Sequence, residues 1–262
     1  FDPKTMDLTE DPLLGFLAPN QSPPEGEGKV SYLVKPKDSL SNGTVIRNKA
    51  KIVFDANQPI LTNEWKVTID DTKPYSTINS LPPVIYDTNF TVSWGGIDPS
   101  GSIKGYNIYV KVNDNSYTPW LVGTNDTSGV YKGHYDSTYK FYSIAFDYAG
   151  NIEETKEIYD TYITLRQLLP PPLVSPEDSS YHIDIKPTFV WDSSHYSLKY
   201  QLQLSDTVNF SNLLIDNQNL IGLSHQYIDS LQYNRRYYWR MRTINGIFKS
   251  SWSPIFSFTT IE

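Results

Sequence analysis

The sequence predicts an all-β protein built from tandem antiparallel β-sandwiches, and a repeated strand pattern is the main reason. Trp94 precedes a strand that opens at Tyr139, and Trp191 precedes one that opens at Tyr237. The two Trp residues lie 97 positions apart and the two Tyr residues 98. Offsets that agree within one residue indicate a repeated unit of about a hundred residues, the size of one immunoglobulin-like sandwich.

Composition supports short strands joined by turns. Aromatic residues make up 14% of the 262 residues, alongside 18 Pro and 14 Gly, a combination typical of β-structure. No stretch approaches the ~20 apolar residues that cross a membrane, so we expect no membrane insertion. We expect any export signal to lie upstream of this chain.

Charge and cysteine content exclude several classes of function. The net charge of −7 and the pI near 5.1 disfavour nucleic acid and anionic lipid as main partners. The absence of Cys excludes zinc–thiolate sites, thiol catalysis and disulfides. Small secreted animal domains often carry disulfides. An acidic, Cys-free chain rich in Tyr, Asn and Thr is more typical of a bacterial extracellular or cell-surface protein.

The first unit is predicted to span residues 1–72 as a partial β-sandwich. Its opening, residues 1–28, is rich in turns. Alternating apolar residues then predict strands around 30–34, 46–54 and 61–69, with a turn at 55–59. Three strands cannot enclose a sandwich core in about 70 residues. We therefore expect an unpaired sheet edge, either because the start of this domain is absent or because a second chain supplies a strand.

This unit also resembles a known segment. Residues 26–32 (GEGKVSY), 43–50 (GTVIRNKA) and 52–60 (IVFDANQPI) look like a segment of large secreted bacterial repeat proteins. In those proteins the segment precedes an immunoglobulin-like or fibronectin-like module. The resemblance implies an extracellular context and implies no activity.

Two full sandwich units are predicted to follow, at residues 73–166 and 167–262. The inward-facing strand residues of the first are Val92, Trp94, Tyr106, Ile108, Val110, Tyr139, Phe141, Ser143 and Ala145, with 158–165 closing the sheet. Those of the second are Phe189, Trp191, Tyr200, Leu202, Leu204, Tyr237, Trp239 and Met241. Each Tyr that opens its strand is expected to form a tyrosine corner, in which the hydroxyl binds nearby backbone.

Both units resemble fibronectin type III modules. Residues 96–106 and 145–151 are similar to bacterial fibronectin type III-like modules, and residues 237–243 and 251–259 resemble the last two strands of a fibronectin type III domain. The second resemblance covers the whole of residues 167–262. It implies an immunoglobulin-like or fibronectin type III-like fold for both units.

No catalytic motif is evident, so we predict that the chain is not an enzyme. None of the four His residues has a neighbour at metal-ligand spacing, and no nucleophile elbow or phosphate-binding loop occurs. Adjacent Glu153 and Glu154 would point to opposite faces of a strand. A glycosidase pair assembled from distant carboxylates stays open as an alternative.

A calcium site is the sharpest local hypothesis. Asp98 follows the Trp94 strand, whereas Asp147, Asn151 and Glu153 precede the last strand, and these two loops lie at the same end of a sandwich. Calcium takes 6–8 oxygen ligands from carboxylates, amides and carbonyls. The alternative is that Asp98 and Asp147 only cap their own turns through side-chain hydrogen bonds.

Exposed aromatic residues could bind carbohydrate. Trp65, Trp120 and Trp252 fall outside the inward-facing patterns, and Trp120 follows Thr118-Pro119 near a strand edge, where a flat ring would suit a sugar. Trp252 has a competing interpretation. Arg240 and Arg242 alternate outward on the adjacent strand and could stack on it as a cation–π ladder, like that beside the Trp-Ser motif of related receptor modules.

Three functions follow as hypotheses. The chain is expected to be a non-catalytic structural, adhesion or assembly module of a secreted or cell-surface bacterial protein, in contact with other chains or neighbouring domains. The second hypothesis is a carbohydrate-binding module for a polysaccharide. The third is an accessory module that completes a neighbouring catalytic domain.

Overall fold

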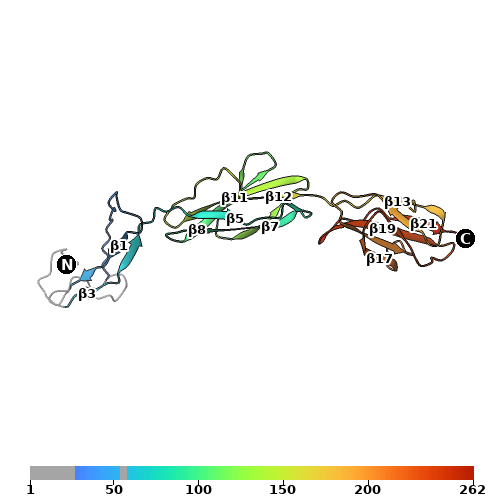
Figure 1. The fold of residues 1–262 in the computed structure, drawn as a ribbon. Helices are drawn as coiled ribbons and strands as arrows, with labels where there is room; N and C mark the ends of the chain where they lie inside the picture. The colour runs from blue at the N-terminus through green and yellow to red at the C-terminus, as the bar shows by residue number, and fades with distance from the viewer. Residues whose placement is uncertain (1–26, 54–57) are drawn as a thin grey trace, which may run out of the picture. The chain divides into compact units, whose positions relative to one another are not determined.

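The structure, a computed structural model, describes residues 27–53 and 58–262, which form β-strands, turns and irregular connections (Figure 1). The chain divides into two compact units, residues 1–69 and 70–262. Among the described residues there is no helix of the length and apolarity needed to cross a membrane. The predicted all-β fold class is confirmed.

The first unit contains a long hairpin. Strand β1 (Val45–Asn48) pairs antiparallel with β4 (Trp65–Thr68), and β2 (Lys51–Ile52) pairs with β3 (Ile60–Leu61). The two ladders meet where Thr62 Oγ1 accepts a 2.8 Å hydrogen bond from the Ala50 amide. Each ladder has two strands among the described residues, and no further described strand pairs with either of them.

One predicted strand of this unit is wrong. Residues 30–34 alternate as a strand would, but they form no ladder with any described residue. Val30 is 91% exposed and Leu33 99%, so these side chains pack on no core, and no described strand pairs with the segment. The predicted turn at 55–59 falls mostly outside the described residues.

The first sandwich packs a three-stranded sheet on a five-stranded sheet. The first sheet has the order β10-β7-β5, with β5 at Tyr75–Ile78, β7 at Asn89–Ile97 and β10 at Ser128–Lys132. The second has the order β6-β12-β11-β8-β9, with β6 at Val84–Ile85, β8 at Ile103–Val112, β9 at Thr118–Thr124, β11 at Ser137–Asp147 and β12 at Thr161–Leu165. All pairs are antiparallel except β6 with β12.

The second sandwich repeats this topology. Its smaller sheet has the order β13-β15-β18, with β13 at Leu173–Ser175, β15 at Thr188–Trp191 and β18 at Ser224–Gln226. Its larger sheet runs β14-β21-β19-β16-β17, with β14 at Ser180–Ile183, β16 at Lys199–Ser205, β17 at Leu213–Leu220, β19 at Arg236–Asn245, β20 at Phe248–Lys249 beside β19, and β21 at Phe256–Thr260. Strand β14 is again parallel to its neighbour β21.

The repeat inferred from the two Trp residues is confirmed. Trp94 on β7 is 2% exposed and Trp191 on β15 is 1% exposed, and each lies on the middle strand of its three-stranded sheet. The indole Nε1 of each is buried without a hydrogen-bond partner. These residues occupy matching positions in two copies of one immunoglobulin-like sandwich.

The two tyrosine corners are also confirmed. The Tyr139 hydroxyl accepts a 2.7 Å hydrogen bond from the backbone N–H of His134, and the Tyr237 hydroxyl accepts a 3.0 Å bond from the N–H of Gln232. Both rings are buried. Each corner therefore fixes the connection that leads into its strand.

Side chains seal one edge of the first sandwich. Strand β12 pairs only with residues 137–141 of β11. Beyond that point the amide of Ser143 donates to Asp160 Oδ2 at 3.1 Å, and that of Ala145 donates to Glu153 Oε2 at 2.8 Å. Asp160 Oδ2 also accepts from the Ile78 amide of β5 at 3.0 Å. One carboxylate thus joins the edges of both sheets.

A lysine completes this seal. Lys156 Nζ lies 2.9 Å from Asp160 Oδ1 and 3.5 Å from Glu153 Oε1, and it donates to the Ser76 carbonyl of β5 at 2.7 Å. The side chains of Glu153, Lys156 and Asp160 are 7%, 20% and 10% exposed. The ammonium therefore balances two carboxylates that bind backbone in a mostly dry environment.

The second sandwich seals the equivalent edge with hydroxyls. The amides of Met241 and Thr243 on β19 donate to Ser253 Oγ and Ser250 Oγ, both at 3.0 Å. Met241 and Thr243 lie 98 residues after Ser143 and Ala145, the spacing of the two corner tyrosines. The same two backbone positions are therefore capped by carboxylates in one copy and by serines in the other.

Replacing either corner tyrosine by Phe should destabilise the chain. Tyr139→Phe and Tyr237→Phe each leave a backbone N–H without its acceptor, at an expected cost of about 1–3 kcal/mol. Urea unfolding of each variant measures this loss. A loss well under half a kcal/mol at both positions would contradict the corner assignment.

Removing the central carboxylate of the first seal should cost more. Asp160→Ala leaves Lys156 without its closest carboxylate and the Ile78 and Ser143 amides without an acceptor, for an expected loss of about 3 kcal/mol. Glu157→Gln, an exposed change in the same loop, is the control and should be near neutral. Equal unfolding midpoints for the two variants would show that the seal adds no stability.

Candidate functional site

Strand register brings three acidic residues together at one end of the first sandwich. Tyr75 of β5 lies opposite Ile97 of β7, so Asp70, which precedes β5, approaches Asp98, which follows β7. Asp147 lies at the end of β11, opposite Ile103 at the start of β8. The topology alone therefore gathers these carboxylates.

The three carboxylates form a compact group. One oxygen from each of Asp70, Asp98 and Asp147 lies within 4.8 Å of the others. Gly101 approaches the group closely, because a Cβ on it would lie 3.0 Å from Oδ2 of both Asp70 and Asp98. Three like charges at this separation repel one another, so the group is a cost to the fold unless a cation balances it.

Asp147 is the most ordered member. It is 2% exposed, its Oδ1 accepts from the amides of Gly150 and Asn151 at 2.7 and 2.8 Å, and its Oδ2 accepts from Asn151 Nδ2 at 2.8 Å. Burial acts to raise the pKa of this carboxyl, but the hydrogen bonds from Asn151, Gly150 and Ala149 outweigh it and leave the pKa below its ordinary value. Asp147 is therefore held as an anion.

Asp98 contributes an oxygen that has no partner. Its Oδ1 accepts from the Ser100 amide at 3.1 Å, whereas its Oδ2 is buried and accepts no hydrogen bond. Ser100 Oγ donates to Asp70 Oδ1 at 2.5 Å. A buried carboxylate oxygen without a donor carries a desolvation cost that a bound cation would remove.

Three of the four residues predicted to bind calcium lie in or beside the acidic group, and one does not. Asp98 and Asp147 converge as expected, and both also cap their own turns, as the alternative interpretation proposed. Asn151 lies beside them and donates from Nδ2 to the Asp70 carbonyl at 3.1 Å. Glu153 does not join the group, because its carboxylate binds Ala145, Ser76 and Lys156 in the edge seal.

Sequence reasoning missed Asp70. It lies just before the boundary between the first two predicted units, where no site was expected. The antiparallel pairing of the first strand with the Trp94 strand was the available signal, since it places residues before the one next to residues after the other.

The three Trp residues considered as sugar-binding candidates differ in their surroundings. Trp120 is only partly exposed and packs edge-on against Trp94, Tyr131 and Phe141, with centroid distances of 6.0, 5.1 and 6.0 Å. Gly129 makes room for it, because a Cβ there would lie 3.1 Å from the Trp120 ring. Trp120 therefore belongs to the margin of the core, and its role in binding a sugar stays a prediction.

The arginine ladder is confirmed. The guanidinium carbons of Arg240 and Arg242 lie 4.3 and 4.4 Å from the Trp252 ring centroid, and Phe210 lies 4.0 Å from Arg240 on another side. Trp65 is the exposed member of the three candidates, at 72%. Trp252 is therefore occupied within the fold, and Trp65 is accessible.

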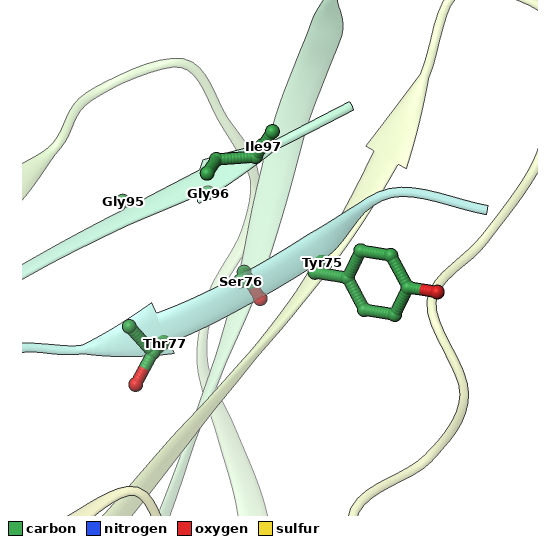
Figure 2. Close-up of a pocket in the computed structure, with 6 residues that line it drawn as sticks. All are labelled: Tyr75, Ser76, Thr77, Gly95, Gly96 and Ile97. Carbon is green, nitrogen blue, oxygen red and sulfur yellow. The ribbon is translucent and has the colours of Figure 1, made fainter. Parts of the chain in front are cut away.

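A shallow pocket of about 420 Å³ lies on the outer face of β5 and β7. Figure 2 shows Tyr75 and Ile97 on neighbouring strands, with Gly95 and Gly96 leaving β7 bare beside them. Ser76 and Thr77 complete the lining. Tyr75 is 64% exposed and Ile97 72%, so this pocket presents an accessible aromatic ring close to Asp98.

Comparisons with known proteins add a family match and a structural likeness. Residues 15–68 match a family described as a domain of unknown function (DUF7619). No curated protein matches the chain. A crystal structure of the FN1–FN3 domains of chicken CNTN1 aligns with a TM-score of 0.42 and 12% identity, over 85% of this chain and 78% of that one.

The class of protein follows from the strand order described above. The two sandwiches are immunoglobulin-like, fibronectin type III-like modules. Because a fold alone does not define an activity, function has to be argued from the acidic group and the exposed surfaces.

Proposed function

We propose that the chain is a non-catalytic structural module of a bacterial secreted or cell-surface protein, used as a spacer or assembly element. The observation that carries this proposal is how the first sandwich uses its buried charges. Glu153, Lys156 and Asp160 bind backbone groups and one another, so they stabilise the fold and are not directed at a substrate. The resemblance of residues 26–60 to secreted repeat proteins supports the extracellular setting.

Carbohydrate binding is the alternative, and it now rests on Tyr75. This ring is exposed beside the shallow pocket on β5 and β7, whereas Trp120 is partly buried at the margin of the core. An accessible aromatic face suits the apolar face of a sugar ring.

Affinity electrophoresis in gels that contain soluble polysaccharides distinguishes the two functions. We expect the protein to migrate equally with and without polysaccharide. Retardation that is lost in Tyr75→Ala and kept in Tyr148→Ala would establish the carbohydrate alternative. Tyr148 is a matched control because it is 74% exposed and lies outside the pocket.

We further propose that Asp70, Asp98 and Asp147 bind calcium. The support is the unpartnered Asp98 Oδ2 within a group of three carboxylates. Calcium prefers such oxygens and completes its 6–8 ligands with carbonyls and water. A bound ion would connect the segment before β5 to the loops after β7 and β11, and so stabilise that end of the sandwich.

Thermal unfolding with and without calcium tests this site. At a calcium concentration 100 times the Kd, one bound ion stabilises the folded state by about 2.7 kcal/mol, and the melting temperature should rise accordingly. Asp98→Asn should abolish the rise. In a calcium chelator the same variant should be no less stable than the unmodified protein, because it removes one of three repelling charges.

Glu157→Gln, which removes an exposed charge outside the group, should keep the full calcium response. A melting temperature of the unmodified protein that does not respond to millimolar calcium would refute the site.

A further inference from the structure

The first unit leaves much apolar surface uncovered. In its described residues, eleven large apolar side chains are exposed: Val30, Tyr32, Leu33, Val34, Val45, Ile52, Val53, Ile60, Leu61, Trp65 and Val67. Exposed apolar surface marks an interaction site where it is contiguous, and four of these residues, Tyr32, Val34, Trp65 and Val67, line one groove.

A groove runs through this surface. It has a volume of about 510 Å³ and is lined by Tyr32, Val34, Pro36, Ile46, Arg47, Asn48, Trp65 and Val67. Trp65 and Tyr32 are 72% and 65% exposed. Trp, Tyr and Arg are the residues that most often dominate binding energy at protein interfaces. We name the groove and its flanking strands β1 and β4 the basic hairpin surface.

The described part of this unit has a charge opposite to that of the two sandwiches, whereas residues 1–26 of the unit contain one basic and five acidic residues. Residues 27–69 contain seven basic and four acidic residues, a net charge of +3, whereas residues 70–262 contain fourteen basic and twenty acidic residues, a net charge of −6. Arg47 and Lys66 flank Glu64 at 2.5 and 3.4 Å, and Lys49 and Lys51 are exposed nearby. An apolar groove with a basic rim is complementary to an acidic protein surface.

We propose that the basic hairpin surface of one molecule binds the acidic sandwich surface of a second copy of this chain. This inference rests on the proposed structural function and names its partner. Opposite charges accelerate encounter and fix orientation, while Trp65 and Tyr32 supply the apolar contact. Because the two surfaces lie on different parts of the chain, each molecule keeps one of them free after a first, unreciprocated contact, and we expect further molecules to add head to tail.

Sedimentation velocity over a range of protein concentrations tests the proposal. We expect species larger than a dimer to grow with concentration at low salt, and the association constant to fall severalfold at high salt because exposed charges are screened. Trp65→Ser and Lys66→Glu should each weaken association severalfold. Tyr148→Ser, matched in exposure at 74%, and Lys104→Glu, an exposed lysine of the acidic unit, should not.

A chain that stays monomeric at high concentration and low salt would overturn the proposal, and so would association that Trp65→Ser and Lys66→Glu leave intact. Assembly that stops at a dimer would show a two-fold contact and contradict the head-to-tail arrangement. None of these results bears on polysaccharide binding, so the proposed structural function is tested separately by the gel experiment. Circular dichroism of each variant shows whether the fold is intact.

Discussion

Both sandwiches depend on closing the edge where the last strand stops short of its neighbour. Strands β12 and β21 pair with only the first part of β11 and β19. The backbone amides in the later part of each longer strand therefore need other hydrogen-bond acceptors along this edge. An unpaired buried amide is costly and an open edge invites foreign strands. Side chains close both seams, and the buried aromatic cores behind them depend on that closure.

The two solutions differ in chemistry although the backbone positions match. In the second sandwich, Ser250 and Ser253 are neutral caps that need no partner of opposite charge. In the first, Glu153 and Asp160 are anions and require Lys156. The carboxylates reach farther and bind two sheets at once, whereas each serine serves one strand. Ser253 belongs to the same turn as Trp252, so the arginine ladder and the edge cap stabilise one segment together.

Much of the fold was predictable because it follows from local alternation. The alternating apolar pattern predicts the strands that contain Trp94, Trp191, Tyr139 and Tyr237. The outward positions of Arg240 and Arg242 predict the cation–π ladder on Trp252. The parts that escaped prediction depend on contacts between distant segments. Asp70 joins the acidic group through strand pairing, and Glu153 is drawn from that group into the seam. Residues 30–34 show that alternation without a partner does not produce a strand.

The unpartnered indoles of Trp94 and Trp191 have a further consequence. Each N–H is buried and donates to no acceptor within the protein, so its environment should change when water enters its own core. The proton resonance of each indole should therefore move when that one sandwich opens and stay fixed when the other does. The repeat places one such reporter at the same position in each module. Nuclear magnetic resonance of these two indole protons would therefore show whether the two modules open together or independently.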